Sequence, residues 1–516
     1  MRSRVLVIAG SDSSGGAGLE ADQRVLTAHG VYSLTATTGL TAQNTLGVQD
    51  IHVVPSKFVR KQIDAALQDV GADVVKLGML SCKETVDEVA SALREHQVSK
   101  VVLDPVMVST SGSQLLPTDA VDDLRTKLLP LTTVLTPNIP EARLLLETSG
   151  ETTTEPHSVD DMIRVAKQLQ TLGPKNVLLK GGHLPLSEAV VRPQAEATDG
   201  GKDESKRVVV DVLCREMGEV VLFETEFLTS KNTHGTGCSL ASAIAANLAL
   251  GKDLEDAVRS AVRYVEAGIK TSVDLGKGSG PINHFHSMYS LPFAPGRFIE
   301  YVLNRPDMKP VWKEFTEHDF VEGLGDGTLP LERFKEYLIQ DYLYLTHFAR
   351  SNALAAYKAQ NMESIAASAK IVMHIKTEME LHLNYCASFG ITREEMERTP
   401  EKQACTAYSR YILDIGQSQD WLALQVALAP CLIGYGMIAQ RLYNQYKHSD
   451  TSKNRYWKWV MNYVADDYVE AVKTGSALLE KDMPTVSPAR LEELVTIFRE
   501  TTKLEIAFWD MGWTGR

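Results

Sequence analysis

Cysteine is scarce in this chain, with six residues in 516. No two of them form a C-x-x-C pair, and the six positions are Cys82, Cys214, Cys238, Cys386, Cys405 and Cys431. This content is too low for a scaffold held by disulfide bonds, which excludes the small disulfide-rich secreted class. We therefore expect a reduced, cytoplasmic protein whose cysteines are free thiols.

Basic residues are also fewer than acidic residues. Lys and Arg number 53 against 66 Asp and Glu, which gives a formal net charge of -13 and a pI of about 5.6. A general binder of nucleic acid or of anionic membranes needs a basic face. We therefore expect neither nucleic acid nor a membrane as a partner, and any phosphate must be held by a local site.

Long uncharged runs are almost absent as well. The apolar run near the N-terminus, Val5–Ala9, stops after five residues, which predicts a strand and not a signal peptide. Trp421–Ala439 carries no charge and approaches membrane-spanning length, but Gln425 and Pro430 interrupt it and no basic cluster flanks it. Because the centre of a helical bundle also needs a helix that is apolar on all sides, we expect a buried helix.

The first half of the chain alternates short apolar runs with helical patterns. Continuously apolar runs are typical of strands covered on both faces, and the alternation predicts a parallel sheet with right-handed crossovers. Leu184–Arg207 is polar and charged, so we expect a surface insertion there. The expected strands are Val5–Ala9, Val74–Leu77, Val101–Asp104, Val134–Thr136 and Val177–Lys180, and the expected helices include Ser56–Asp69, Lys83–His96 and Val159–Thr171.

The pattern changes near residue 290, where strands give way to helical spacing. At about 150 residues per domain, the length predicts two large domains or three smaller ones. We assign residues 1–289 to the α/β domain, 290–296 (SLPFAPG) to a linker and 297–516 to an all-α domain. The expected helices are Phe298–Val302, Trp312–Glu322, Leu331–Lys358, Met362–Phe389, Ala404–Gln417, Asp420–Lys447, Tyr456–Leu478 and Pro488–Asp510.

Two glycine-rich segments in the first half have the composition of ligand-binding loops. Ala9–Asp22 reads AGSDSSGGAGLEAD after a buried strand, and Asn232–Ser239 reads NTHGTGCS before a helix. Glycine allows the backbone to approach a ligand closely, and a helix N-terminus offers free N–H groups. Gly235–Cys238 is expected to form a nest for an anion, although each segment alone also fits a tight turn.

Cys238 stands in the field of that expected helix N-terminus. The field predicts a lowered thiol pKa, and a thiolate there could take a proton from an attacking hydroxyl. A small buried residue at a helix start is the alternative. Asp104 and Lys180 follow two other strands, so a carboxylate for Mg²⁺ and an ammonium for phosphate are expected at the same sheet edge.

Residues 3–289 closely resemble the hydroxymethylpyrimidine/phosphomethylpyrimidine kinases of thiamin synthesis, which are ribokinase-like enzymes. The motifs that carry the resemblance, in order, are AGSDSSGGAG, TAQNT (Thr41–Thr45), KLGML (Lys76–Leu80), DPVM, TPNIPEA (Thr136–Ala142), KGGH and NTHGTGC. The resemblance implies a three-layer α/β sandwich with a mostly parallel sheet, and ATP and Mg²⁺ as the phosphate donor and the metal.

The resemblance also implies roles for individual residues. Cys238 is the expected base, and Gln43 is expected to bind the aminopyrimidine edge, because its amide offers a donor and an acceptor. Pyridoxal kinase is the alternative, since its pocket also holds a hydroxymethyl heteroaromatic ring. The further residues implied are Gly10 and Met79 in the substrate pocket, Gly235, Thr236 and Gly237 at the phosphates with Lys180, and Asp104 at the metal.

In the second half, three expected helices each carry one reactive group among apolar neighbours. Asp341 has Tyr337 and Tyr344 at helical neighbour spacings, Glu505 lies among aromatic residues, and Cys431 has Tyr435 four residues on. A buried carboxylate needs a partner or a ligand, and helix bundles build sites from such inward groups. A structural hydrogen bond for Asp341 and inert packing for Cys431 are the alternatives.

Residues 297–513 resemble thiaminase II, an aminopyrimidine hydrolase with a haem-oxygenase-like helical bundle. The matching stretches are QDYLYL, ACTAYSRY (Ala404–Tyr411), APCLIGYG (Ala429–Gly436), WKWVMNYVADDY (Trp457–Tyr468) and KLEIAFWDM (Lys503–Met511). The resemblance implies that Cys431 is a nucleophile, that Glu505 moves protons and that Asp341 binds the aminopyrimidine. It also implies that four tyrosines shape the pocket, namely Tyr344, Tyr408, Tyr435 and Tyr463.

Taken together, the two resemblances predict a bifunctional cytoplasmic enzyme of thiamin synthesis and salvage, of the kind in which fungi fuse a kinase to thiaminase II. We expect its partners to be ATP, aminopyrimidines and thiamin, and we expect a homo-oligomer. One alternative is a pyridoxal-type vitamin kinase fused to a helical module that binds a pyrimidine without catalysis.

Overall fold

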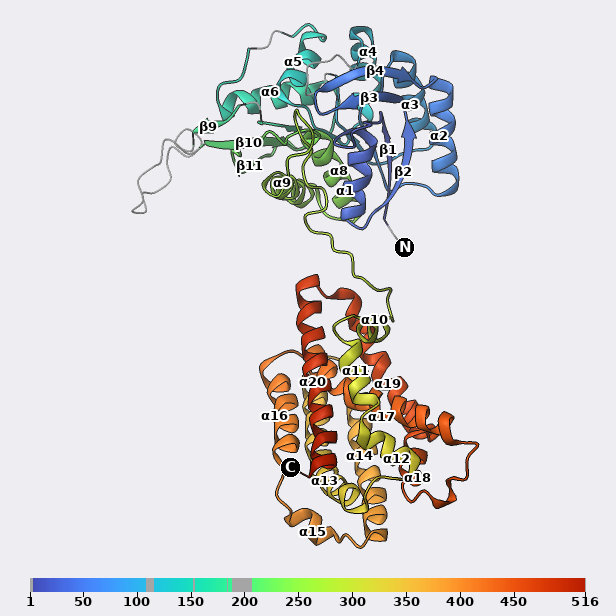
Figure 1. The fold of residues 1–516 in the computed structure, drawn as a ribbon. Helices are drawn as coiled ribbons and strands as arrows, with labels where there is room; N and C mark the ends of the chain where they lie inside the picture. The colour runs from blue at the N-terminus through green and yellow to red at the C-terminus, as the bar shows by residue number, and fades with distance from the viewer. Residues whose placement is uncertain (1–2, 108–115, 152–153, 183, 188–206, 516) are drawn as a thin grey trace, which may run out of the picture. The chain divides into compact units, whose positions relative to one another are not determined.

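The computed structural model describes residues 3–107, 116–151, 154–182, 184–187 and 207–515 (Figure 1). The chain divides into two compact units, Met1–Met288 and Tyr289–Arg516. Most of the expected insertion at Leu184–Arg207, together with the hydroxyl-rich residues 109–111 and the histidine of the KGGH motif, lies outside the described residues. Each unit is built on its own core, so each is described by itself.

The first unit is built on a mostly parallel sheet. Its strands run in the order β11-β10-β8-β7-β6-β5-β1-β2, with β9 beside β10. The pairs from β2 to β8 are parallel, whereas β10 is antiparallel to β8 and β11. The strands are β1 (Arg4–Ala9), β2 (Tyr32–Thr37), β5 (Val74–Leu77), β6 (Val101–Leu103), β7 (Val134–Leu135), β8 (Asn176–Leu179), β9 (Leu186–Ser187), β10 (Arg207–Cys214) and β11 (Val220–Glu226).

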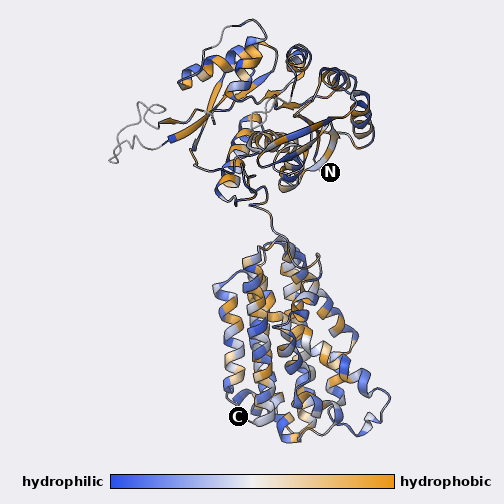
Figure 2. Ribbon diagram, turned by 45° about the horizontal axis from the view of Figure 1, so that its top comes forward, coloured by the Kyte–Doolittle hydropathy of each residue, from blue (hydrophilic) through white to orange (hydrophobic). Residues whose placement is uncertain are grey.

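Helices cover both faces of this sheet, as the continuously apolar strands predict. Along β1, Leu6 and Ile8 pack on one face while Val5 and Val7 pack on the other. Apolar colour follows the strands between the two helical layers (Figure 2). One face carries α2 (Ser56–Asp69), α3 (Lys83–Glu95), α4 (Thr118–Asp123), α5 (Ile139–Glu147) and α6 (Val159–Thr171), and the other carries α1 (Gly18–Ala28), α8 (Thr236–Ala249) and α9 (Leu254–Lys270).

A separate antiparallel hairpin stands beside this sheet. It consists of β3 (Gly39–Asn44) and β4 (Gly47–Val53), and its register shifts between Ala42 and Gln43. A shift of this kind re-aims the side chain at the bulge. The hairpin is tied to the first loop, because the hydroxyl of Ser13 bonds to both backbone groups of Gln43 at 2.8 Å.

The second unit is helical throughout its described residues, as expected. The apolar helix α17 packs against α20, which also contacts α11, α13 and α16. The helices are α10 (Phe298–Asn304), α11 (Lys309–Thr316), α12 (Asp319–Asp326), α13 (Leu331–Lys358), α14 (Met362–Ser388), α15 (Arg393–Arg398), α16 (Gln403–Ser418), α17 (Trp421–Tyr446), α18 (Trp457–Tyr463), α19 (Asp466–Asp482) and α20 (Pro488–Thr514).

Two of the expected helices are each divided in the structure. The segment Trp312–Glu322 breaks because the ring of His318 caps α12 by accepting the Phe320 N–H at 3.1 Å. The segment Tyr456–Leu478 breaks between α18 and α19, where Ala465 takes an extended conformation before two aspartates in the first turn of α19. Acidic residues in a first turn stabilise a new helix N-terminus. The apolar spacing alone therefore did not show that the predicted helix is interrupted.

The expected linker, Ser290–Gly296, is part of the helical unit. Leu291 and Phe293 pack against its core, and the Phe293 ring lies 5.7 Å from Phe298 and 5.2 Å from Tyr301. The segment therefore contributes apolar contacts to the fold that follows it.

Helix α17 is long and apolar enough to cross a membrane by length and composition, with a mean hydropathy of 1.8. In the structure, 72% of its most apolar window is buried inside the unit. Pro430 lies within this helix and is itself buried. The burial agrees with the expected core helix of a bundle.

Candidate active sites

The first unit has a cavity of about 470 Å³ at the carboxyl ends of its strands. Ligands of open α/β sheets bind at this edge. The β3–β4 hairpin and the start of α8 complete the lining. All nine residues predicted for the first site line this one cavity, namely Gly10, Gln43, Met79, Asp104, Lys180, Gly235, Thr236, Gly237 and Cys238.

Glycines let the backbone close around this cavity. Gly235 is the N-cap of α8 with a φ of 78°, a conformation that disfavours other residues. A Cβ on Gly235 would collide with the backbone oxygen of Gly16, and a Cβ on Gly10 would collide with the Met79 side chain. The N-terminal turn of α8 therefore lines the cavity, and a helix N-terminus is suited to an anion.

The Cys238 thiol lies in the first turn of α8, as predicted, but its pKa is not lowered. Burial raises that pKa to about 12, although the charge of Lys76 opposes the rise. The expectation of a lowered pKa was wrong, because the loss of hydration on burial outweighs a helix field worth about 1 kcal/mol. The Cys238 thiol is therefore protonated at neutral pH.

Asp104 and Lys180 form an ion pair beside this helix start. Nζ of Lys180 lies 2.8 Å from Oδ1 of Asp104, and Asp104 is nearly fully buried. The buried carboxyl of Glu141 lies close to both, and burial raises the pKa of Glu141 to about 7. The prediction missed Glu141, which stands in the TPNIPEA motif and also accepts the Asn138 N–H at 2.8 Å.

A second ion pair lies deeper under the cavity, and the prediction missed it as well. Nζ of Lys76 lies 2.9 Å and 3.0 Å from the two carboxylate oxygens of Asp22, and both side chains are fully buried. The Ser242 hydroxyl donates to the same carboxylate at 2.7 Å. The positive charge of Lys76, in the KLGML motif, lowers the pKa of the Cys238 thiol and so opposes the effect of burial.

Asp12 and His234 connect the first loop to the NTHGTGC segment. Nε2 of His234 lies 2.8 Å from Oδ2 of Asp12, which also accepts the Ala17 N–H at 2.8 Å. The Asp12 carboxyl has a pKa lowered to about 2; burial opposes this, and the hydrogen bonds from His234 and Ser14 produce it. The side-chain nitrogen of Gln43 lies 3.3 Å from the same ring nitrogen, so the expected substrate-binding amide borders this pair.

The helical unit brings Cys431, Glu505 and Tyr408 together from α17, α20 and α16. The Tyr408 hydroxyl donates to Oε1 of Glu505 at 2.5 Å. The Cys431 side chain lies within hydrogen-bonding reach of the same carboxyl. Burial raises the pKa of Glu505 to about 8, so this carboxyl is mostly protonated at neutral pH.

Asp341 lies on α13 and is almost fully buried. Its Oδ2 atom accepts no hydrogen bond from any residue that the structure describes. Burial raises the pKa of Asp341 to about 7, and the Tyr337 hydroxyl opposes this rise. A buried carboxyl oxygen with an open acceptor position is suited to a polar ligand.

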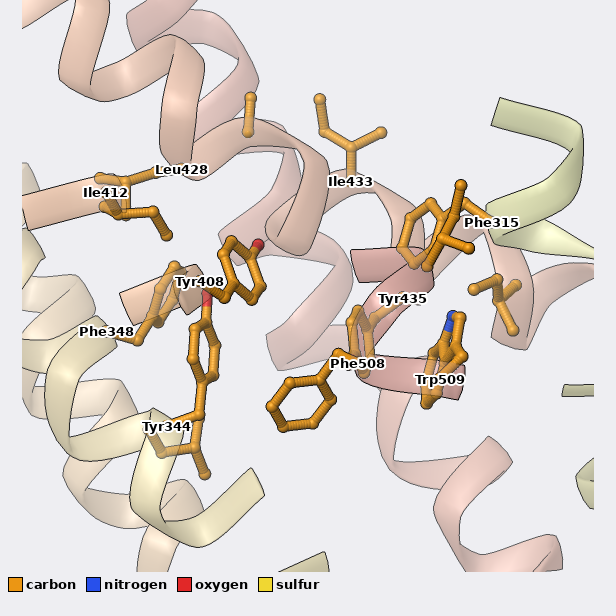
Figure 3. Close-up of a cluster of buried hydrophobic side chains, with 14 of the residues drawn as sticks. Phe315, Tyr344, Phe348, Tyr408, Ile412, Leu428, Ile433, Tyr435, Phe508 and Trp509 are labelled. Atoms are coloured by element: carbon orange, nitrogen blue, oxygen red, sulfur yellow. The ribbon is translucent and has the colours of Figure 1, made fainter. Parts of the chain in front are cut away.

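The four predicted tyrosines lie in one aromatic cluster, three of them labelled in Figure 3. The rings of Tyr344 and Tyr408 are stacked with their centroids 4.7 Å apart. Tyr463 is only half-buried, and its ring lies 5.4 Å from Tyr435 and 4.8 Å from Tyr468. The cluster also contains two aromatic side chains of α20 that the prediction did not select, Phe508 and Trp509.

Comparison with protein families assigns the two units to two models. Residues 12–283 match the model described as phosphomethylpyrimidine kinase. Residues 305–515 match the TENA/THI-4/PQQC family. The two matches cover the cavity of the first unit and the Cys431–Glu505 cluster of the second.

Similar proteins carry both parts in one chain. A Schizosaccharomyces pombe protein named as a hydroxymethylpyrimidine/phosphomethylpyrimidine kinase is 44% identical, over 98% of this chain and 90% of the relative. A hydroxymethylpyrimidine/phosphomethylpyrimidine kinase of Saccharomyces cerevisiae is 35% identical, over 98% of this chain and 94% of the relative. Among solved structures, a Clostridium difficile phosphomethylpyrimidine kinase is 38% identical, covering 51% of this chain and 98% of its own, with a TM-score of 0.41.

Proposed function

We propose that this chain, which belongs to the phosphomethylpyrimidine kinase family in its first half and to the TENA/THI-4/PQQC family in its second, is a bifunctional enzyme of thiamin biosynthesis and salvage. The first unit phosphorylates 4-amino-5-hydroxymethyl-2-methylpyrimidine to its monophosphate and then to its diphosphate, with ATP as the donor. The second unit hydrolyses thiamin or its aminopyrimidine breakdown products.

At the kinase site, Cys238 is the group that accepts the hydroxyl proton. The reactive form carries Cys238 as a thiolate. As the substrate oxygen forms its bond to the γ-phosphorus, the bond to ADP breaks and the proton passes to the Cys238 thiolate. The N–H groups at Gly235–Cys238 and the Lys180 ammonium stabilise the charge on the phosphoryl oxygens. Support comes from the shared cavity, which holds all of these groups.

A divalent metal accompanies ATP in such chemistry, and the residues at the cavity suit Mg²⁺. Mg²⁺ takes one or two carboxylates together with phosphate oxygens and water. Oδ1 of Asp104 is engaged by Lys180, whereas Oδ2 faces Gly237 at the anion site. We propose that Asp104 holds the ion through Oδ2, with Glu141 as a second carboxylate nearby. The ion, when bound, neutralises part of the phosphate charge.

At the hydrolase site, we propose that Cys431 is the nucleophile. Its sulfur adds to the pyrimidine ring, and the bond between the exocyclic methylene and the leaving group breaks. Water then adds to the methylene, and the Cys431 sulfur leaves the ring as its bond to carbon breaks. Glu505 moves protons to and from the ring and the leaving group, and Asp341 binds the amino group and the adjacent ring nitrogen. Support comes from the contact of Cys431 and Tyr408 with the Glu505 carboxyl, which unites three helices.

The observation that carries the kinase proposal is the cavity shared by Cys238, Lys180 and Gln43. The test is ATP-dependent phosphorylation of the hydroxymethylpyrimidine by the full chain, measured beside pyridoxal. We expect the pyrimidine to have the higher kcat/KM and both phosphoryl transfers to occur. A preference for pyridoxal would favour the vitamin-kinase alternative.

We also propose that the enzyme works in the cytoplasm as a homo-oligomer. None of the six cysteines forms a disulfide bond in the structure, and two of them carry proposed chemistry that needs a reduced thiol. Light scattering of the purified chain tests the oligomeric state, and fractionation of cells that express it tests the compartment.

A further inference from the structure

Helix α14 places one histidine against the buried carboxyl of Asp341. Nδ1 of His382 lies 3.8 Å from Oδ2 of Asp341, and both side chains are largely buried. This is the oxygen that accepts no hydrogen bond from the described residues. The sequence gives little warning of the contact, because residues 341 and 382 lie on different helices.

The other ring nitrogen of His382 determines which atom faces the carboxyl. Nε2 lies 3.0 Å from the backbone oxygen of Leu338, which can only accept a hydrogen bond. Nε2 must therefore carry a hydrogen in both the neutral and the charged ring. In the neutral ring, Nδ1 has a lone pair and faces the Asp341 oxygen as a second acceptor. One proton between Nδ1 and Oδ2 removes this repulsion.

The surroundings of Asp341 offer no other cation among the described groups that act on it. Burial disfavours the charged form of both groups, since it raises the pKa of Asp341 to about 7 and lowers that of His382. The remaining titratable groups that act on Asp341 or feel its charge come from every packed helix, namely Tyr337 (α13), Cys386 (α14), Cys405 (α16), Tyr435 (α17) and Glu505 (α20).

An aminopyrimidine needs one proton at the same place. Its amino group donates a hydrogen bond, whereas the neighbouring ring nitrogen is an acceptor. A carboxylate alone can pair with the first but is repelled by the second. One proton between the carboxyl and the ring nitrogen satisfies both, and a protonated ring accepts a thiol more readily.

We propose that His382 and Asp341 store one proton between them and that this proton passes to the ring nitrogen when an aminopyrimidine binds. No bond other than the N–H and O–H bonds changes, and the pair is left as neutral imidazole and carboxylate. His382 is a positioning residue that acts through Asp341. The inference rests on the proposed function of the helical unit, in which Asp341 contacts the pyrimidine.

The test measures the thiamin dissociation constant against pH by calorimetry, without ATP, in the full chain carrying Cys431→Ser to stop turnover. Because the bound state needs the stored proton, affinity should fall as pH rises through the apparent pKa of the pair. His382→Gln keeps a donor for the Leu338 oxygen but removes the titratable nitrogen. It should weaken binding about tenfold at neutral pH and move the midpoint to lower pH.

Three further variants make the result decisive. His382→Asn also lacks a titratable nitrogen and must show the same lowered midpoint, while His374→Gln, on the same helix two turns earlier, must show none. Asp341→Asn offers a donor and an acceptor with no proton to lose, so the midpoint that belongs to the pair should disappear. Far-ultraviolet circular dichroism verifies that the helical unit of each variant is folded.

A chain with His382→Gln that keeps the original affinity and midpoint would overturn the inference, since only the bond to Leu338 would then matter. A midpoint that survives in Asp341→Asn would do the same. If the chain without any of these substitutions cleaves no thiamin, the proposed function fails, and the inference fails with it. If that chain cleaves thiamin but His382→Gln keeps the original affinity and midpoint, only the inference fails.

Discussion

At the scale of single residues, Cys238 carries the first prediction. Cys238→Ala should lower kcat for pyrimidine phosphorylation by about 10² to 10⁴, the usual cost of losing a general base, and should change the KM for ATP little. Burial raises the pKa of this thiol to about 12, so kcat/KM should rise with pH above neutrality in the unmodified enzyme. A coupled assay across this pH range measures both effects.

Cys214 offers the matched control for that variant. It is also a free, buried cysteine of the first unit, but it lies in β10 and does not line the cavity. Cys214→Ala should keep the kinase rate. An unchanged rate in Cys238→Ala would mean that water or another group takes the hydroxyl proton.

Cys431 carries the second prediction. Cys431→Ser should abolish thiamin cleavage, because an alcohol is far less ionised near neutral pH than a thiol. Substrate affinity should remain, since Asp341 and the tyrosines are untouched, and so should the kinase rate. Product release followed by chromatography measures the cleavage, with Cys82→Ser in the other unit as the control. Cleavage at the original rate would exclude the covalent mechanism.

Glu505 carries the third prediction, which concerns pH. Burial raises the pKa of Glu505 to about 8, so the protonated carboxyl is present below about pH 8 and is lost as pH rises through that value. Because the carboxyl donates a proton during cleavage, kcat should fall above pH 8. Glu505→Gln should lower kcat by about 10² to 10⁴ and remove this limb.

The exposed Glu493, on the same helix, is the control for Glu505. Glu493→Gln should leave both the rate and the pH profile of thiamin cleavage unchanged. If the limb above pH 8 persists in Glu505→Gln, another group supplies the proton.

At the scale of elements, the N-terminus of α8 carries the fourth prediction. Gly235→Ala adds a Cβ at a φ of 78° against the backbone of Gly16, so the helix start or the first loop must move. We expect a loss of more than about 1 kcal/mol in stability and at least a tenfold loss in kinase rate. Thermal unfolding and the coupled assay measure the two.

Gly251→Ala separates the two causes of that loss. Gly251 has a φ of 90°, but nothing lies within 4 Å of an added Cβ. The substitution to alanine therefore costs only the strain of the left-handed backbone conformation. The control should lose stability without losing kinase rate. Equal effects of the two substitutions would show that contact with the first loop does not matter.

Several elements with a strong apolar pattern were predicted, although the apolar strands β10 and β11 were not among them. Val74–Leu77 and Val159–Thr171 appear with the expected bounds. A strand or helix that is buried on one or both sides needs apolar residues at regular positions, and the sequence shows that spacing. The polar hairpin β3–β4 was not predicted, since GLTAQN lacks the apolar run that marks a strand. The break before α12 was also missed, because it depends on the capping geometry of His318.

At the scale of the whole molecule, the fifth prediction concerns separation of the units. A cut between Met288 and Tyr289 should leave a kinase fragment and a hydrolase fragment that each fold and act, since each has its own core. A helical fragment that begins at Pro295 lacks Leu291 and Phe293, and it should be about 2 kcal/mol less stable than one that begins at Tyr289.

Activity assays and denaturant titration of the three fragments measure this prediction. Loss of both activities after the cut at residue 288 would show that the units depend on each other. Equal stability of the two helical fragments would show that the segment 289–294 contributes nothing to the core.

The sequence by itself determined the two fold classes, the division near residue 290 and most of the residues that we propose for the two sites. Apolar periodicity is a property of the chain, and glycine-rich segments that follow strands identify the edge where ligands bind. Motif order was enough to select Cys238, Lys180 and Asp104 for one cavity. It was also enough to select Cys431 and Glu505 for one cluster of helices.

Only the tertiary structure decided which other groups surround these residues and how strongly water is excluded from them. Lys76 contacts Asp22, 54 positions earlier in the sequence, and His382 of α14 lies beside Asp341 of α13. Sequence spacing could not reveal either contact. The raised pKa of Cys238 depends on burial by the assembled unit, which outweighs the local helix field. Local chemistry is readable from the chain, whereas its electrostatic setting is a sum over packed neighbours that only folding brings together.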